Sequence, residues 1–339
     1  MRIRIATPAP KGSRRGNRIT AERWAGILAS LGHRVRVESA LSGDAFDVLV
    51  ALHAEKGAAA VAAAKRSDPE RPVVLALTGT DVEGRVGLSR RARKSMEDAD
   101  VLVVLQRRML RSVPRALRHK AVVVVQSAVR DAAAMRVRPR RGTFQVCALA
   151  HLRAVKDPLL LARAVRSLPA SSRVRVVHAG AALDAASARA AREESRSNPR
   201  WRWVGEVSHA RAMRLLRESR ALVLTSRAEG GPGVVGEAVV HGVPVLATRI
   251  PAVLALLGSG YRGTFRPGDA AALARLLGRA ERDPRFLRAL AKAGRAKAAQ
   301  FGPARERAAW RTILASVARR SLAGGRLTAR RPARRRRAP

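Results

Sequence analysis

Cysteine and aromatic residues are scarce in this chain of 339 residues. Its single cysteine, Cys147, excludes a disulfide within the chain and a metal site built from cysteine thiolates. Phe, Trp and Tyr together make up 3% of the residues, so Ala, Val and Leu must fill most of the core. We expect Cys147 and the four tryptophans to be buried packing residues and not ligand contacts; the tryptophans are Trp24, Trp201, Trp203 and Trp310.

Long apolar runs are also missing. No stretch reaches the roughly 18 consecutive apolar residues of a membrane helix, and no secretory leader precedes the first expected strand at residues 2–7. A single cysteine fits a reducing compartment. We therefore expect a soluble, cytoplasmic protein with no membrane partner.

Acidic residues are outnumbered, with 25 Asp and Glu against 68 Lys and Arg, which gives a formal net charge of +43. The arginines are spread along every segment, and only the end, with nine Arg and no acid from Arg319 onward, forms a block. This spread favours an arginine-rich solvated surface, which also attracts phosphorylated small molecules. The sequence shows no platform of aromatic residues interleaved with basic ones of the kind that binds RNA, and no metal-finger spacing. We expect no specific nucleic-acid partner and keep a non-catalytic, nucleic-acid-binding protein as the less favoured alternative.

A strand, turn and helix pattern repeats along the chain. The expected strands of a first unit are residues 2–7, 34–38, 47–52, 72–77, 101–105 and 121–126. Their continuous apolar runs are typical of parallel strands that are buried on both faces. Trp24, Ile27, Leu28 and Leu31 lie at helical spacing, which predicts a helix with Thr20 as its N-cap.

A second unit follows a charged Pro/Gly break at residues 137–142, the candidate linker. Its expected strands are residues 143–148, 173–178, 201–204, 221–225, 244–247 and 263–265. We predict an α/β protein with two doubly wound Rossmann-like domains, 1–138 and 139–302, that face a central cleft. Helix 303–322 is expected to pack back towards the first domain, and the Arg-rich tail 323–339 to be disordered.

The second unit contains a glycine-rich turn between an apolar strand and an apolar helix. Glu229 and Glu237 stand eight positions apart, with Gly230 and Gly231 directly after the first. This arrangement resembles the Glu-x7-Glu signature of nucleotide-sugar glycosyltransferases with the GT-B fold. The resemblance implies that Glu229 faces the donor sugar, that Glu237 holds the ribose hydroxyls, and that the backbone from Gly230 to Val234 binds the donor. A surface-helix position is the alternative for Glu237.

Two basic residues, Arg153 and Lys156, follow the first strand of the second unit. There they would neutralise the pyrophosphate of a nucleotide-sugar donor, Arg as a bidentate partner and Lys as a point charge. GT-B enzymes generally use such side chains and a helix N-terminus instead of a metal, so we expect no metal and no cofactor. The alternative is two ordinary basic residues in a basic chain.

In the first unit a basic, glycine-bearing loop precedes the first helix. Its backbone amides and guanidinium groups could hold a small anion. The candidate acceptor-binding residues are Gly16, Asn17, Arg18 and Thr20. A flexible, solvated basic loop is the alternative.

Polar residues also end two strands of the first unit. His53 follows one apolar strand and could orient or deprotonate an acceptor, or be structural. Thr80 and Asp81 follow the next strand as further acceptor-binding candidates, with a turn-forming Asp as an equal alternative. The predicted catalytic residues are His53 and Glu229.

Several sequence blocks together, in order, resemble the selenosugar synthases of selenoneine biosynthesis. They include residues 16–24, 49–54, 76–81, 151–158, 178–184, 229–231 and 242–251. The resemblance implies that selenophosphate attacks the anomeric carbon of UDP-N-acetylglucosamine, giving 1-seleno-N-acetylglucosamine, UDP and phosphate. It also implies two pathway partners, a selenophosphate synthetase and a selenoneine synthase.

The chain departs from this family at the glycine turn, where Asn and Ser would be expected in place of Gly233 and Gly236 and where Pro232 stiffens the backbone. It also lacks the aromatic segment that usually follows Asp81. An ordinary GT-B glycosyltransferase with a hydroxyl acceptor, or a nucleotide-sugar epimerase, therefore stays open. So do the exact sugar, the anomeric stereochemistry and the preference for selenium over sulfur.

Overall fold

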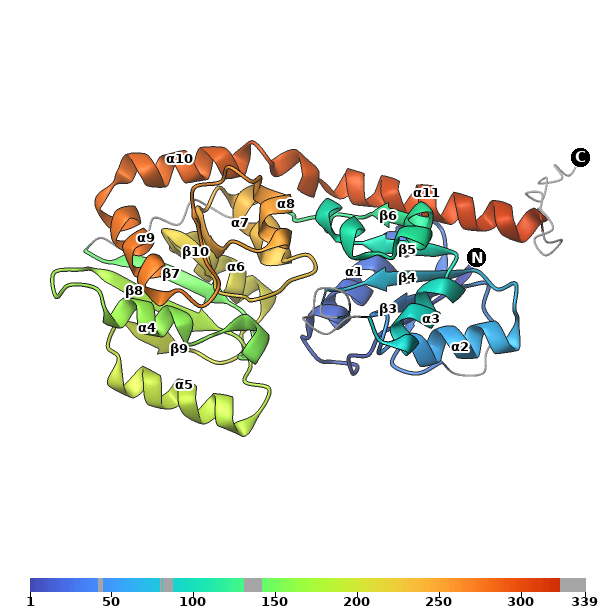
Figure 1. Cartoon of the computed structure of the whole chain (residues 1–339), viewed down its shortest axis with the longest axis horizontal. Helices are drawn as coiled ribbons and strands as arrows, with labels where there is room; N and C mark the ends of the chain where they lie inside the picture. Colours follow the sequence, from blue (N-terminus) through green and yellow to red (C-terminus); the bar gives the residue numbers. More distant parts are fainter. Residues whose placement is uncertain (42–44, 80, 82–87, 131–141, 324–339) are drawn as a thin grey trace, which may run out of the picture.

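A computed structural model of the chain describes residues 1–41, 45–79, 81, 88–130 and 142–323. They form two parallel six-stranded sheets, ordered β2-β1-β3-β4-β5-β6 and β12-β11-β10-β7-β8-β9. Helices cover both faces of each sheet, and the two α/β domains lie side by side (Figure 1). The predicted fold class, two Rossmann-like domains, is confirmed.

The first sheet is made by the strands β1 (Arg2–Ala6), β2 (Arg34–Glu38), β3 (Val48–Leu52), β4 (Val73–Leu77), β5 (Val101–Val104) and β6 (Ala121–Val123). Every residue of β3, β4 and β5 is buried, as their uninterrupted apolar sequences predict. The accompanying helices are α1 (Gly16–Ser30), α2 (Ala58–Ser67), α3 (Arg90–Asp98) and the 3₁₀ helices η1 (Arg107–Ser112) and η2 (Arg115–Lys120).

The second sheet contains β7 (Phe144–Leu149), β8 (Val174–Ala179), β9 (Trp201–Trp203), β10 (Ala221–Leu224), β11 (Val245–Thr248) and β12 (Thr264–Phe265). Its helices are η3 (Ala154–Lys156), α4 (Leu160–Arg166), α5 (Ala185–Ser197), α6 (His209–Glu218), α7 (Gly233–His241), α8 (Pro251–Leu257), α9 (Ala270–Arg282), α10 (Pro284–Arg295) and η4 (Ala298–Phe301). All twelve strands lie within three residues of the predicted limits.

The predicted start of the first helix is wrong. Helix α1 begins at Gly16, because the amides of Arg18 and Ile19 already bond to the carbonyl of Arg15. Thr20 is therefore inside the helix and is not its N-cap. Its hydroxyl accepts a hydrogen bond from Gln126 Nε2, at 2.7 Å, instead of from a helix amide.

Three of the four tryptophans are buried as predicted, and the fourth, Trp203, is half-buried against the core of the second domain. Trp24 of α1 meets Trp310 of α11 (Pro303–Ala323) edge to face, with ring centroids 4.8 Å apart, and both are fully buried. Helix α11 thus leaves the second domain and runs along the first (Figure 1). Trp201 is buried in the second domain. Cys147 is buried there too, and burial raises the pKa of its thiol to about 12.

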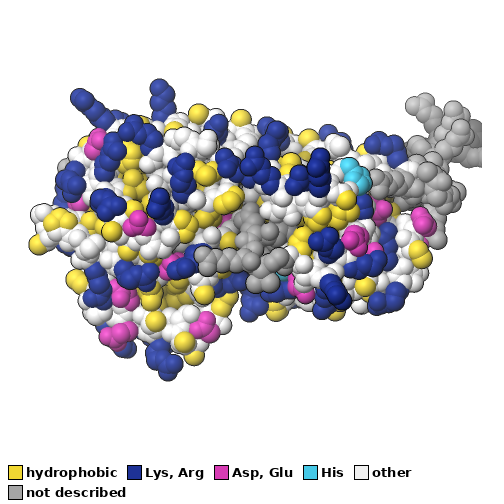
Figure 2. Space-filling view, in the orientation of Figure 1, with side chains coloured by type: hydrophobic (Ala, Val, Ile, Leu, Met, Phe, Trp, Pro, Cys, Tyr) yellow, Lys and Arg dark blue, Asp and Glu magenta, His cyan; other side chains and the backbone are white. Residues whose placement is uncertain are grey.

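The basic surface has the predicted character. Figure 2 shows Lys and Arg side chains scattered over both lobes, with Asp and Glu among them. Three predictions fall partly or wholly outside the described residues: the linker at 137–142, the Arg-rich tail and the position of Thr80. In the part of the chain that the structure describes, no helix is long and apolar enough to cross a membrane.

Candidate active site

The loops that follow β4 and β10, at the carboxyl ends of the two sheets, touch each other. A Cβ atom on Gly230 would lie 2.4 Å from the carbonyl oxygen of Thr78, and one on Gly79 would lie 2.3 Å from the amide of Gly230. Beside them, a Cβ on Gly231 would lie 2.7 Å from Leu105 Cβ. Since real Cβ contacts are longer, only glycine fits at this crossing.

The two predicted donor residues Lys156 and Glu229 are brought together. Lys156 Nζ lies 2.5 Å from Glu229 Oε1, and Ser226 Oγ donates to the same oxygen at 2.6 Å. Both side chains of the ion pair are mostly buried. The structure therefore holds a cation and a carboxylate, from the turns after β7 and β10, at the carboxyl edge of the second sheet.

A second pair, which the sequence did not indicate, supports this arrangement. Arg227 donates to Asp157 Oδ2 through Nη2 at 2.8 Å and through Nε at 3.1 Å, and its amide donates to the Val155 carbonyl at 2.8 Å. Asp157 has a left-handed backbone with φ 43, which Asp tolerates better than most residues. The pair ties the turn that carries Lys156 to the turn that carries Glu229.

Glu237 lies in α7, one turn after the helix begins, and its side chain is 17% exposed. His209 Nδ1, at the start of α6, lies 3.8 Å from its Oε1. Burial raises the pKa of the Glu237 carboxyl, and the charges of His209, Arg23 and His241 oppose that rise. Glu237 is thus neither a fully exposed surface residue nor in contact with Glu229 through any described bond.

Of the two departures from the selenosugar synthases, at Gly233 and Gly236, the one at Gly236 has a packing explanation. Gly236 faces the 3₁₀ helix η4, and a Cβ added to Gly236 would lie 2.8 Å from Cδ1 of Phe301. Gly233 begins α7, whose N-cap, Pro232, makes no side-chain hydrogen bond to it. The Pro232 side chain therefore does not cap the first amides of α7, including that of Val234. Amides that no side chain caps are what an anion-binding helix start needs.

His53 follows β3 in a conformation that is uncommon outside glycine, with φ 76, and it is 6% exposed. Its Nδ1 accepts a hydrogen bond from the amide of Lys56 at 3.2 Å. Burial lowers the pKa of the imidazole, Asp81 opposes this effect, and Lys56 and Arg153 add to it. The ring is therefore neutral at pH 7, with its proton on Nε2.

Asp81 connects the turn after β3 to the turn after β4 by accepting hydrogen bonds from backbone amides. Its Oδ2 accepts from Ala54 at 2.8 Å and its Oδ1 accepts from Gly79 at 2.7 Å, while His53 Nδ1 lies 3.9 Å away. The predicted contact between Asp81 and an acceptor stays a prediction. Arg153, from the second domain, acts electrostatically on His53, so the cleft brings these two predicted residues within range of each other.

The predicted acceptor residues Gly16, Asn17, Arg18 and Thr20 form the first turns of α1. Arg18 is 5% exposed, and its Nε donates to Glu22 at 2.6 Å. Its Nη1 is buried and has no hydrogen-bond partner among the described residues. The preceding loop reaches the second domain, where His151 Nε2 donates to the carbonyl of Arg14 at 2.9 Å.

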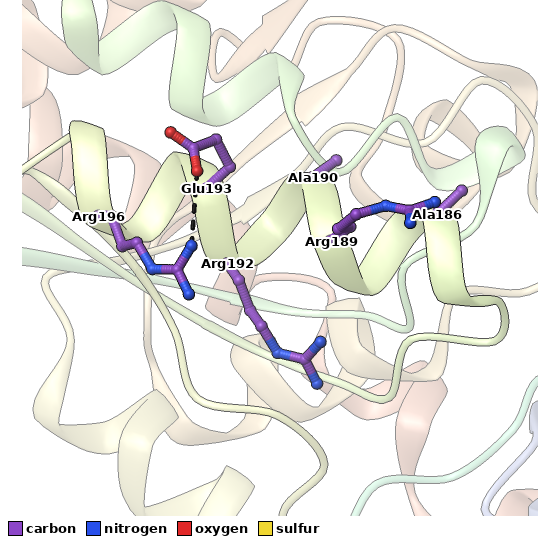
Figure 3. A pocket seen from close by; sticks show the side chains of 6 residues that line it. All are labelled: Ala186, Arg189, Ala190, Arg192, Glu193 and Arg196. Atoms are coloured by element: carbon purple, nitrogen blue, oxygen red, sulfur yellow. Dashed lines mark ion pairs between the residues drawn. The ribbon is translucent and has the colours of Figure 1, made fainter.

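A hollow on the outer face of α5 is not part of this site. Arginine side chains from successive turns of the helix line it, as Figure 3 shows, and one of them, Arg196, pairs with Glu193 at 3.6 Å. Both members of this pair are exposed. Within the described ranges, no three His, Cys, Asp or Glu side chains gather as metal ligands.

Comparisons with known proteins agree with the geometry. Residues 129–297 match the family model of Glycosyl transferases group 1. HepE from Anabaena, solved with UDP-glucose, has 16% identity over 93% of this chain and 100% of its own, with a TM-score of 0.74. Sucrose-phosphate synthase from Thermosynechococcus elongatus has 15% identity over 96% and 99%, with a TM-score of 0.73. A search of curated protein sequences gives no match.

The fold shared with these structures is GT-B. Residues 129–297 match a glycosyl transferases group 1 domain, and the protein is a glycosyltransferase.

Proposed function

We propose that this glycosyltransferase is a selenosugar synthase. In the proposed reaction the selenium of selenophosphate attacks the anomeric carbon of UDP-N-acetylglucosamine, and the carbon–oxygen bond to the β-phosphate breaks, so that UDP leaves with the electron pair. Water then hydrolyses the selenium–phosphorus bond, which gives 1-seleno-N-acetylglucosamine and inorganic phosphate. A selenophosphate synthetase would supply the acceptor, and a selenoneine synthase would consume the product.

The donor half is supported by the second domain. HepE, which has the same fold, was solved with UDP and with UDP-glucose. In this chain Lys156 and Arg153 would neutralise the diphosphate as its charge develops, together with the first amides of α7. Glu237 would accept from the ribose hydroxyls, and Glu229 would face the sugar.

The observation that carries the acceptor is the state of His53. A hydroxyl acceptor must lose a proton, and a general base beside it needs a free nitrogen lone pair. His53 Nδ1 already accepts from the Lys56 amide, so this nitrogen cannot act as the base, and the neutral ring carries its proton on Nε2. Such a ring suits a nucleophile that arrives as an anion and needs no base, as selenophosphate does.

Two further features favour a small anionic acceptor. The backbones of Gly79 in the first domain and Gly230 in the second touch each other beside Glu229, which leaves little room for a bulky acceptor at that point. Helix α1 begins with uncapped amides, and the buried Arg18 Nη1 has no described partner, so this end of the helix suits an anion. Asn17 and Thr20 would complete the acceptor site, and Thr80 and Asp81 stay further acceptor-binding candidates.

An ordinary GT-B glycosyltransferase with a hydroxyl acceptor is the second candidate. It is favoured by Gly233 and Gly236, which stand where the selenosugar synthases usually have Asn and Ser. The packing of Gly236 on Phe301 accounts for one of these two positions without reference to the substrate.

UDP release from UDP-N-acetylglucosamine, measured separately with selenophosphate, thiophosphate, phosphate and glycerol, tests the proposal. We expect release with selenophosphate, and a tenfold or larger rise in its KM in Arg18→Gln with unchanged UDP affinity. Arg93→Gln, an exposed position on α3, is the control. Release that depends on glycerol and ignores selenophosphate would establish the hydroxyl acceptor instead.

A further inference from the structure

The carboxylate of Glu306, in the first turn of α11, is completely buried. It accepts hydrogen bonds from Trp24 Nε1 at 2.9 Å, from the amide of Ser127 at 2.8 Å and from Ser127 Oγ at 2.6 Å. Arg23 Nη1 lies 3.9 Å from it. One carboxylate thus joins three parts of the chain: α1, the segment that leaves the first domain, and the helix that returns to it.

That segment, residues 125–128, contacts both domains. Val125 and Ala128 pack against the core of the second domain. Gln126 bonds to Thr20 of α1, and Ser127 bonds to Glu306 and receives a hydrogen bond on its carbonyl from Arg23. The two outer residues of this short segment are therefore attached to the second domain, and the two inner residues to the first.

The returning chain is attached in the same place. Phe301 is buried in the core of the second domain, against Gly236 of α7, and its carbonyl accepts from the Ala128 amide at 3.0 Å. Five residues later Glu306 belongs to the first domain. The two chain crossings thus run side by side, and the hydrogen bonds of Glu306 connect them to α1.

We propose that Glu306 is a positioning residue for the transfer reaction, which fixes the angle between the domains and so the place of His53 relative to Lys156 and Glu229. It contacts neither substrate. With its charge removed, Ser127 and Trp24 keep their donors but lose a charged acceptor, and such bonds are about twice as strong as neutral ones. The contacts of residue 306 with Trp24 and Ser127 then weaken, and the two domains sample a wider range of separations.

Pulsed electron paramagnetic resonance between two spin labels tests this directly. Arg66→Cys at the end of α2 and Arg189→Cys on α5 place one label on an exposed site of each domain. The native Cys147 is fully buried, so it does not compete for the label. Relative to the native background, Glu306→Gln should at least double the width of the distance distribution.

A matched control exists within one domain. Glu281 is also a buried carboxylate that accepts from a serine hydroxyl, Ser172 Oγ at 2.8 Å, and from a main-chain amide, Arg173 N at 2.6 Å. Glu281→Gln should lower thermal stability and leave the distance distribution unchanged. If Glu306→Gln does not fold, Ser127→Ala removes one of the three bonds and should widen the distribution in the same direction.

UDP affinity distinguishes a change in the angle between the domains from a general loss of folded structure. This measurement rests on the proposed function only for the choice of UDP as ligand. Since the donor residues lie in the second domain, Glu306→Gln should change the UDP dissociation constant by less than threefold. A native distance distribution in Glu306→Gln or, where that variant does not fold, in Ser127→Ala would overturn the proposal. A variant with a widened distance distribution whose native background does not bind UDP would contradict the assignment of the donor site. It would still support the proposed role of Glu306.

Discussion

Lys156 Nζ lies 2.5 Å from Oε1 of Glu229, so the turn after β7 and the turn after β10 present opposite charges to each other at the cleft. In the absence of a donor, the carboxylate keeps the ammonium group in place. Since the leaving group of a nucleotide sugar gains negative charge as its bond breaks, we propose that the Lys156 ammonium group stabilises the transition state at this point.

Replacing Lys156 tests that role. Lys156→Met should lower kcat/KM for the UDP-sugar about a hundredfold, the usual loss when one preorganised charge partner is removed. Lys94→Met is the control, because Lys94 pairs with Asp98 at the same 2.5 Å but on the exposed face of α3. Steady-state kinetics that show equal effects for the two variants would contradict the assignment.

The Asp157–Arg227 pair should matter through Lys156. Asp157→Asn keeps a side chain that tolerates the left-handed backbone but removes the charge, so we expect the KM for the UDP-sugar to rise several-fold with little change in thermal stability. Asp47→Asn breaks a comparable pair with Arg2, which lies far from the cleft in the first domain. A KM that rises in neither variant would mean that the pair does not position the turn.

A methyl group added where Gly230 crosses Gly79 should push the two loops apart. In Gly230→Ala the new Cβ would meet the Thr78 carbonyl at 2.4 Å, so the two loops must separate by about 1 Å to restore ordinary contact. We expect transfer to fall at least tenfold. Gly233→Ala, three residues on, would meet only Gln126 Oε1 at 3.5 Å and should retain activity within about threefold. Similar activities for both alanine variants would show that this contact is not needed for transfer.

His178 should make stability depend on pH. It is buried, its Nε2 donates to the Ala150 carbonyl, and burial lowers its pKa from 6.5 to about 4. The unfolded chain therefore binds a proton between these values and the folded chain does not, so stability falls as the pH falls from 6.5 towards 4. The loss from this residue is about 3 kcal/mol.

Urea denaturation at pH 7 and at pH 4 checks this value. His178→Gln keeps a donor near the Nε2 position and cannot titrate, so most of that loss should disappear. His119→Gln, on an exposed side chain, is the control and should behave as the native chain. An unchanged pH dependence in His178→Gln would show that His178 is not the group responsible.

The strands were predictable because their apolar runs are continuous and their ends carry Gly, Pro or charge, as at β3 and β4. That Lys156 and Glu229 lie at the same edge of the second sheet followed from the rule that parallel strands end at one edge, but their direct ion pair was not predicted. The role of Glu306 could not be predicted from the sequence, since no local pattern distinguishes a buried carboxylate from a solvated one in an Arg-rich helix. Asp157, His178 and the crossing of Gly79 with Gly230 likewise depend on contacts between segments distant in sequence.

The measurement that most directly tests the central claim is mass spectrometry of the purified protein with UDP-N-acetylglucosamine and freshly made selenophosphate, without added metal. The account predicts an N-acetylhexosamine product with the selenium isotope pattern, together with UDP and inorganic phosphate in equal amounts. UDP release with no selenium in any sugar product would contradict it.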